Sequence, residues 1–312
     1  MRAVAARGRW IWAVSGVVTL AFLVVPGIHL ITSGGQNENA EPQATLTRSV
    51  TVPQPVTSVT VQSYGAPVEV RAGPGRRVHV TETISYDASA GNLSAVPQQA
   101  SASPISAAPG GADGASSGSG SGAPVVLQSV SGGHLSLTAP ACASSDCSVG
   151  FALTVPPDVS AAVASDGGSI TVSGIAGANL DSANGPVTAT DISGPLTVST
   201  GGGSLQLNGL AGPLSADTGN GDVTAYGISA ATATVTTDGG DAMLAFSAAP
   251  DAVMVSTGGG AAQLVLPGGP YALTADSGGG PQSVGMATDP AARRSITVIS
   301  DGGSLGIVPS GR

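Results

Sequence analysis

One short motif recurs eight times in the second half of the chain and sets the register of the residues around it. Each copy ends in Gly, has Gly or Asn one residue earlier and has Ser or Thr three residues earlier, as in "TGNG" at 218–221. Successive copies lie 17 to 23 residues apart. Agreement at three positions in every copy indicates a repeated structural unit. The final glycines of the copies are Gly168, Gly185, Gly203, Gly221, Gly240, Gly260, Gly280 and Gly303.

Apolar residues flank each motif with a period of two. They stand seven and five residues before the final glycine and two and four residues after it, and Gln282 is the single exception. A period of two is typical of a strand with one buried face, so each repeat predicts two strands around a corner. Because Gly and Asn adopt positive φ at low cost, we expect the corner to be sharp. We expect its Ser or Thr to hydrogen-bond backbone amides that the corner leaves free. A second corner is expected about six residues after the final glycine, as at Gly174.

Two all-β architectures accommodate such repeats. Asn-Gly between alternating runs is a hairpin signal and allows an antiparallel β-meander. Alternatively, each repeat is one coil of a β-solenoid with about 18–20 residues per coil. We favour the solenoid because stacking in register requires the same residue type at the same position, whereas a meander requires only complementary neighbours.

The N-terminus predicts a membrane anchor. Residues 10–32 form a long apolar run, and Arg2, Arg7 and Arg9 precede it. About 20 apolar residues span a bilayer and Arg-rich flanks stay in the cytoplasm. We therefore predict a single-pass cell-membrane protein with its bulk extracytoplasmic. A cleaved signal peptide and a secreted protein are the alternative.

The predicted organisation follows the composition along the chain. Residues 1–9 form the cytoplasmic N-terminus, 33–48 a polar stalk and 49–312 the extracytoplasmic solenoid domain. Within that domain, residues 88–124 have almost no large apolar side chain, and we interpret them as a disordered insert. The whole chain of 312 residues is 41% hydrophobic but only 3% aromatic, which favours thin layers of small aliphatic side chains.

The charge of the exported part limits its partners. It carries 7 Arg, no Lys and 19 acidic residues, and so has a net charge of −12. Nucleic-acid binding requires a basic face, so we expect no nucleic-acid partner. The lipid bilayer, reached through the N-terminal segment, and a protein or cell-surface partner are the expected contacts.

The only two cysteines are Cys142 and Cys147, five residues apart in a polar loop. An even pair in an exported chain predicts a local disulfide. No His lies close in sequence, so the pair makes a poor zinc site.

The anchor, the alternating strands and "FALTVPPDVSAAVASDGGSITVSGIAG" at 151–177, followed by "STGGGSLQLNGLAGPLSADTGNGDVTAYGI", resemble a known family. This is the bacterial β-strand-repeat family labelled "putative adhesin", a domain of unknown function. Toast-rack envelope domains are more distantly similar. The resemblance implies a right-handed, single-stranded β-helix displayed in the cell envelope, and it transfers no catalytic or binding residues.

Metal and cofactor sites are not expected. Calcium rolls need an Asp in every turn, but Asp precedes the glycines only at Asp166, Asp238 and Asp301, and Ca²⁺ takes six to eight oxygen ligands. The glycine-rich turns lead into strands and the chain has no Lys, which excludes a P-loop.

Catalytic and carbohydrate-binding signals are equally sparse. His79 and His134 have no evident partner, and the paired Arg293 and Arg294 have only Asp289 nearby in the sequence. Trp10 and Trp12 belong to the predicted membrane edge. That leaves Tyr226 and Tyr271 as exposed-ring candidates. The residues that we expect to form an outer Ser/Thr/Gln face are Thr171, Thr188, Gln206, Thr224 and Gln263.

These observations predict a non-catalytic, membrane-anchored envelope or surface protein, an adhesin or a stress-sensing interaction scaffold. The alternative is a carbohydrate-active β-helix enzyme acting on cell-wall or environmental glycans, which three or more acids on adjacent coils beside a groove would favour. A third hypothesis is self-assembly through an open solenoid end. We expect Pro309, just past the last strand, to cap the C-terminal end against it.

Overall fold

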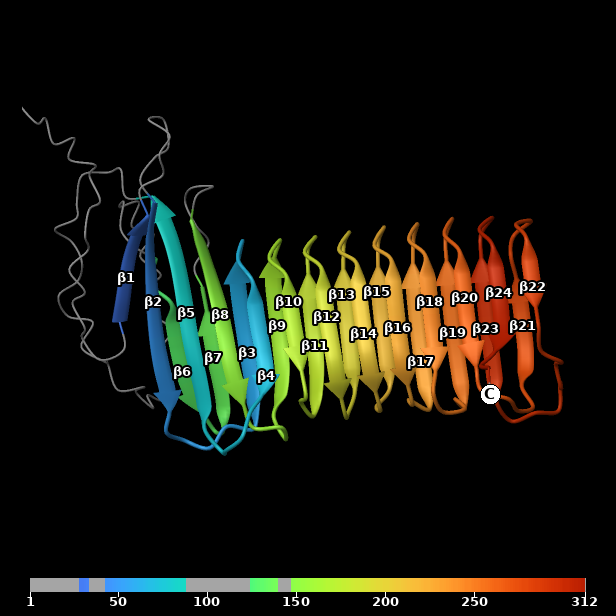
Figure 1. The fold of residues 1–312 in the computed structure, drawn as a ribbon, viewed down its shortest axis with the longest axis horizontal. Helices are drawn as coiled ribbons and strands as arrows, with labels where there is room; N and C mark the ends of the chain where they lie inside the picture. Colours follow the sequence, from blue (N-terminus) through green and yellow to red (C-terminus); the bar gives the residue numbers. More distant parts are fainter. Residues whose placement is uncertain (1–27, 34–42, 88–123, 140–146, 312) are drawn as a thin grey trace, which may run out of the picture.

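The computed structural model describes residues 28–33, 43–87, 124–139 and 147–311, and all regular secondary structure in these residues is β-strand. The strands stand side by side along one rod (Figure 1). Their pairings form two ladders, joined by a single bridge between Tyr64 and Val149. Alternate side chains of both ladders are buried in one continuous apolar core.

Each ladder follows the axis of the rod. In spatial order, ladder A contains β6 (Leu127–Ser131), β7 (His134–Thr138), β3 (Ser58–Tyr64), β9 (Ser160–Asp166), β11 (Gly177–Ser182), β13 (Leu196–Thr200), β15 (Leu214–Thr218), β17 (Thr232–Thr237), β19 (Ala252–Thr257), β23 (Ser295–Ser300) and β21 (Ala272–Asp276). Ladder B contains β1 (Ile28–Ser33), β2 (Gln43–Val52), β5 (Val78–Asp87), β8 (Ser148–Val155), β4 (Val68–Ala72), β10 (Ile170–Ser173), β12 (Val187–Ile192), β14 (Leu205–Leu210), β16 (Val223–Ile228), β18 (Ala242–Phe246), β20 (Ala262–Leu266), β24 (Leu305–Pro309) and β22 (Gln282–Val284).

Pairing is antiparallel at the N-terminal end, in β6–β7 and in β1–β2–β5–β8. From β7 onward in ladder A and from β8 onward in ladder B it is parallel, which identifies the repeats as coils of a β-solenoid. A coil consists of one strand of ladder A, a glycine corner and one strand of ladder B. Ser165, Ser182, Thr200 and Thr218 are paired in register on successive coils, as a solenoid requires. The prediction of an all-β solenoid is therefore confirmed. The alternative of an antiparallel meander is wrong, because the repeats pair with their own copies in parallel.

The glycine corners are glycine for a reason that the sequence did not reveal. A Cβ on Gly185 would lie 2.1 Å from the carbonyl oxygen of Gly168, and one on Gly221 would lie 2.0 Å from that of Gly203. The same clash recurs at each final glycine, because the corners stack backbone on backbone. Positive φ, the expected cause, does not occur at the final glycines; within these corners it occurs at Gly167, Gly278, Gly279 and Gly302. At the second corner positive φ occurs in four coils, at Gly174 (72°), Asp191 (55°), Gly209 (66°) and Gly227 (64°). Asp191 is the only described non-glycine residue with a positive φ.

A column of buried hydroxyl groups runs beside the glycine corners. The hydroxyls of Ser182, Thr218, Thr237, Thr257 and Ser277 each donate to the carbonyl of the glycine three residues later, at 2.5 to 2.9 Å. The expected acceptance from a backbone amide occurs only at Thr200, which accepts from Gly203 N at 2.9 Å. The column therefore satisfies corner carbonyls that face the core rather than water.

The C-terminal end of the rod departs from sequence order. β23 and β24 lie between the β19–β20 coil and the β21–β22 coil, so the last strands of the chain are inserted one coil inside the end. Gln282 breaks the apolar pattern because its coil is the terminal one and the side chain is exposed. The expectation that Pro309 caps the end is wrong: Pro309 pairs with Leu266 inside the ladder.

The N-terminal end shows the same departure and contains a coil that the repeat pattern missed. β3 and β4 form a coil between β7–β8 and β9–β10. Ser63 Oγ donates to the carbonyl of Ala66 at 3.0 Å, the bond that the other corners make. Ala66 replaces the glycine and hid the repeat. Ala66 is tolerated because the neighbouring β7–β8 coil has a glycine, Gly150, beside it. A Cβ on Gly150 would lie 3.3 Å from the Ala66 methyl group.

Several predictions on the N-terminal half fall partly outside the described residues. Of the predicted membrane segment, residues 28–32 lie in β1, paired antiparallel with β2, and residues 10–27 lie outside the description. β2 begins at Gln43, inside the predicted stalk. The predicted insert lies outside the described residues except for Pro124. The described residues contain no helix with the length and hydropathy needed to cross a bilayer.

Cys147, which immediately precedes β8, takes part in a disulfide bond. Cys142, its predicted partner, lies outside the described residues.

Stacked corner backbones predict that adjacent glycines differ sharply in tolerance. A Cβ on Gly260 would lie 2.1 Å from Gly240 O, whereas one on Gly259 meets nothing within 4 Å. We expect Gly260→Ala to destabilise the protein by about 3 kcal/mol or more through overpacking, and Gly259→Ala to have little effect. Urea denaturation followed by circular dichroism measures both. Equal midpoints for the two variants would contradict the stacking explanation.

The hydroxyl column predicts a second, smaller effect. Thr218→Val keeps the side-chain shape but leaves the carbonyl of Gly221 without its 2.7 Å donor, so we expect a loss of about 1–2 kcal/mol. Thr224→Val, on the outward row of β16, serves as the matched control and should be near neutral. Thermal melts of the two variants measure the difference. A Thr218→Val variant that melts at the same temperature as the wild type would show that the column does not stabilise the corners.

Candidate binding groove

A groove crosses ladder A parallel to the axis of the rod. It has a volume of about 500 Å³ and lies over the first residues of β7, β3, β9 and β11, reaching β13. Since parallel strands are about 4.8 Å apart, five adjacent strands give a groove roughly 20 Å long. The lining residues are Ser58, Val59, Thr60, His134, Ser160, Ala161, Ala162, Ala176, Gly177, Ala178, Asn179, Pro195 and Thr197.

Small residues on β9 and β11 hollow the groove. Ala162 is paired in register with Thr60 on one side and with Asn179 on the other. The outward row is therefore deep at Ala162 and higher at its neighbours. Gly177 begins the next strand, and a Cβ there would lie 3.0 Å from the carbonyl of Pro195. The floor of the groove is thus backbone and methyl groups, with polar side chains along its sides.

The groove carries hydrogen-bonding groups without formal charge. Hydroxyls of Ser58, Thr60 and Thr197, the amide of Asn179 and the imidazole of His134 line it. Its lining contains no Asp, Glu, Lys or Arg. Such a surface can hydrogen-bond an uncharged polar ligand, and it offers neither the charge pair nor the carboxylates that glycoside hydrolysis uses.

The structure gives both histidines a hydroxyl partner that the sequence did not reveal. His134 Nδ1 lies 2.9 Å from Ser58 Oγ, and His79 Nδ1 lies 2.9 Å from Thr51 Oγ1. The two pairs are on different ladders, and only His134 is at the groove. Within the described residues neither imidazole has a hydrogen bond to a carboxylate, so a Ser–His–Asp arrangement is not assembled.

The expected outer face is present as one row of ladder B. Thr171, Thr188, Gln206 and Thr224 are paired in register, and Met243 separates Thr224 from Gln263. Of the two candidate rings, Tyr226 is exposed, and its hydroxyl lies 3.1 Å from Met243 Sδ.

The other expected surface residues are less available than the sequence suggested. Tyr271 is fully buried, which corrects its expected exposure, and its hydroxyl donates to Pro267 O. Arg294 forms an ion pair with Asp251 at 3.8 Å, a partner that the sequence did not indicate.

A buried carboxyl group near the N-terminal end was not recognised from the sequence. Glu82 occupies a core-facing position of β5 between Val80 and Ile84 and is only 2% exposed. Gln128 Nε2 on β6 donates to its carboxyl, and Arg48 lies opposite it on β2. Burial raises the pKa of Glu82 from 4.5 to about 6, although the Arg48 charge opposes the rise.

Metal ligands do not gather in the part of the chain that the structure describes. There, no three or more His, Cys, Asp or Glu side chains come together as a cation site would need. Asp222 and Asp241 instead accept hydrogen bonds from the backbone of the following coil, Asp222 from Asp241 N at 2.9 Å and Asp241 from Ala261 N at 2.7 Å.

Comparison with known proteins adds little to this geometry. No protein-family model matches the chain, and no curated protein matches it. One solved structure, described as a "putative cell adhesion protein" from Clostridium sporogenes, aligns over 85% of this chain and 99% of its own. It is 10% identical with a TM-score of 0.28. At that score the similarity supports no inference, and the family resemblance in the motifs stays a prediction.

The raised pKa of Glu82 predicts a pH dependence with a definite sign. The folded state holds the Glu82 proton more tightly than the unfolded state, so this carboxyl favours folding below pH 4.5 and its contribution is lost as pH rises through about 6. This pKa shift corresponds to about 2 kcal/mol in the free energy of unfolding between low and neutral pH. We expect Glu82→Gln to be more stable than the wild type at pH 7 and to equal it near pH 4.

The exposed Glu69 provides the matched control. Its ion pair with Arg71, at 3.6 Å, lies on the surface and contributes little to stability, so Glu69→Gln should follow the wild type at both pH values. Urea denaturation at pH 4, 5, 6 and 7 measures the difference. A constant gap between Glu82→Gln and the wild type across this range would contradict the buried-carboxyl explanation.

Proposed function

We propose that this chain is a non-catalytic, membrane-anchored envelope protein that uses its solenoid as an interaction scaffold, either for adhesion or for sensing envelope stress. The observation that carries the proposal is the uncharged groove on ladder A. The partner that we propose for this groove is an extended, uncharged polar chain that lies along the axis of the rod.

The shape and chemistry of the groove support this choice of partner. Its polar groups come from successive strands, so they repeat at the spacing between strands, about 4.8 Å. An extended ligand can therefore place one hydrogen-bonding group opposite each coil. With no charged residue in the lining, binding depends on hydrogen bonds and on the shape of the floor rather than on ion pairs.

The rigidity of the scaffold also supports a binding role. Hydrogen bonds between coils and a continuous aliphatic core fix the lining residues before any ligand arrives. A preorganised site loses less entropy on binding than a mobile loop.

Export and anchoring are part of the proposal and rest on sequence features. The apolar run at 10–32 follows three arginines, and the disulfide on Cys147 is typical of an oxidising compartment. We also infer a right-handed coil, the hand that parallel crossover connections adopt in nearly all proteins.

The alternative, an enzyme acting on glycans, requires a pair of carboxyl groups at the bound substrate. The groove supplies none, so this alternative enters only as an outcome of the test.

Filling the groove should weaken binding. Ala162→Arg places a long cation on the floor of the groove, and we expect binding to envelope fractions to weaken by about tenfold or more. Gln263→Arg makes the same charge change on ladder B and should bind like the wild type. Cosedimentation of the purified full chain with wall glycan and, separately, with envelope proteins measures the binding.

Two results would contradict the proposal. Equal binding by the two variants would remove the groove from the interaction, and release of reducing sugar from wall glycan by the wild-type chain would favour the enzyme.

A further inference from the structure

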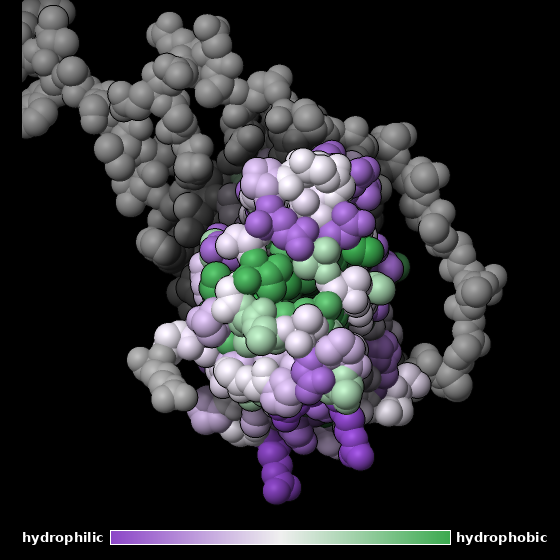
Figure 2. Space-filling view, turned by 90° about the vertical axis from the view of Figure 1, so that its right-hand side faces the viewer, coloured by the Kyte–Doolittle hydropathy of each residue, from purple (hydrophilic) through white to green (hydrophobic). Residues whose placement is uncertain are grey.

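The C-terminal end of the rod leaves two sheet edges and the core between them uncovered. The terminal coil pairs on one side only, β21 with β23 and β22 with β24. Val284, which corresponds to fully buried residues in the inner coils, is 38% exposed. Leu273, Ala275 and Met286 are only partly buried against the core. Figure 2 looks onto this end, where an apolar slot lies between polar margins.

The chain closes part of this end itself. Thr288 Oγ1 accepts from Leu273 N at 3.0 Å, and Asp289 N donates to Tyr271 O at 2.8 Å. The loop that follows β22 therefore blocks the first half of the β21 edge. The second half of β21, from Thr274 to Asp276, and the whole of β22 have no partner strand on the outer side among the described residues.

We propose that this end binds a second copy of itself across a two-fold axis. A single peptide strand could extend one edge and would leave the other edge and the slot uncovered. A second copy of the same end carries two open edges with the same separation and an apolar slot of the same width, so it satisfies both edges and covers both slots. Self-complementary contacts of this kind are the rule in symmetric dimers.

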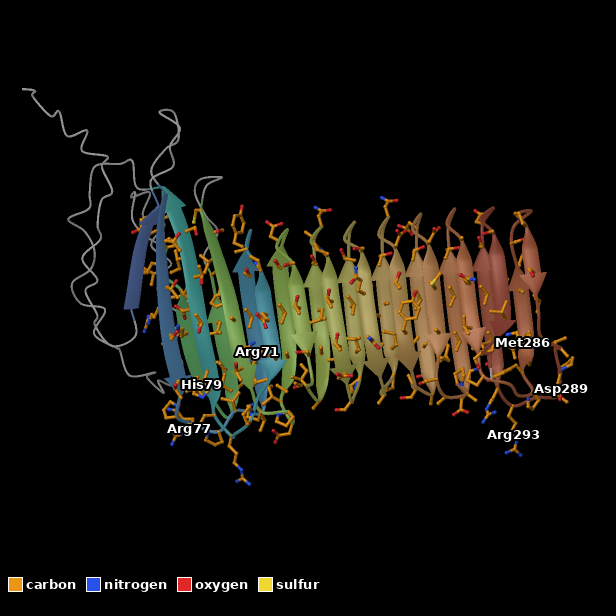
Figure 3. The ribbon with its side chains drawn as sticks, viewed as in Figure 1. Arg71, Arg77, His79, Met286, Asp289 and Arg293 are labelled. Carbon is orange, nitrogen blue, oxygen red and sulfur yellow. The ribbon has the colours of Figure 1, made fainter. Side chains whose placement is uncertain are left out.

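Charge supports this occupant. A two-fold axis that pairs β21 with β21 and β22 with β22 makes the paired edges antiparallel and brings the corner end of one copy against the loop end of the other. Asp276 is exposed at the corner end of β21. Arg293 is exposed in the loop that follows β22, at the opposite end of these strands from the corner, and its side chain points away from the rod (Figure 3). Each copy thus offers one carboxylate and one guanidinium to the opposite groups of its partner.

The inference does not require the groove. Under the proposed function, whose anchor precedes the opposite end of the rod, the contact forms at the distal tip, where it can join molecules on facing surfaces. The solution experiment below tests the contact alone, so its result is independent of envelope binding.

Sedimentation velocity of the purified full chain over a range of concentrations, in one detergent condition, tests the proposal. We expect a monomer–dimer equilibrium that Val284→Lys weakens by about tenfold or more, because a charge enters the covered slot. Ser215→Lys makes the same change on the exposed outer row of β15 and should dimerise like the wild type. Circular dichroism melts establish that both variants are folded.

A charge exchange provides the second arm. Asp276→Arg and Arg293→Asp should each weaken the dimer, and the two changes in one chain should restore it. The proposal is overturned if Val284→Lys and Ser215→Lys dimerise equally, which would indicate association through another segment. A monomer at every concentration or open-ended polymers would also overturn it.

Discussion

Close contact between the backbones of successive coils fixes the spacing of the solenoid, and its strand pairing and core follow from that spacing. At each glycine corner, a Cβ added to the final glycine would lie only about 2 Å from a carbonyl oxygen of the neighbouring coil. Glycine at this position therefore sets the distance between coils, and the strands on either side can pair in parallel and in register. The buried Ser or Thr three residues earlier then supplies a donor to the corner carbonyl. The two features together explain why both residue types recur.

A thin core follows from this stacking. Each coil contributes a few aliphatic side chains, and the described core is mostly Val, Leu, Ile and Ala with few rings such as Phe151, Phe246 and Tyr271. In such a core each coil is covered by the next one, so the coils at the two ends of the rod need a different arrangement of strands. At both ends the outermost coil is out of sequence order, and the chain places a later or earlier coil inside it. The ends are therefore held by strands whose neighbours in sequence lie deeper in the rod.

Both proposed contact surfaces arise where the repeat is imperfect. The groove forms because Ala162 and Gly177 replace larger outward residues on neighbouring strands. The open slot forms at the terminal coil, which has Gln282 where the others have buried apolar residues and whose Val284 is not covered by a further strand among the described residues. A regular solenoid face offers a uniform surface, so local departures from the repeat provide the specificity that a binding protein requires.

The repeat, the strand pattern and the choice of a solenoid could all be predicted from the residues alone, because stacking in register selects residue type position by position. The sequence located all eight glycine corners and the outer row from Thr171 to Gln263. The order of the coils at the ends could not be predicted from the residues, since parallel copies with the same pattern can stack in more than one order. The coil at Ala66 escaped detection because its neighbour, Gly150, relaxes the glycine requirement from a distant part of the chain. The groove, the His134–Ser58 pair and the burial of Glu82 were likewise beyond the sequence. Each depends on strands far apart in the chain that become neighbours only when the ladders form.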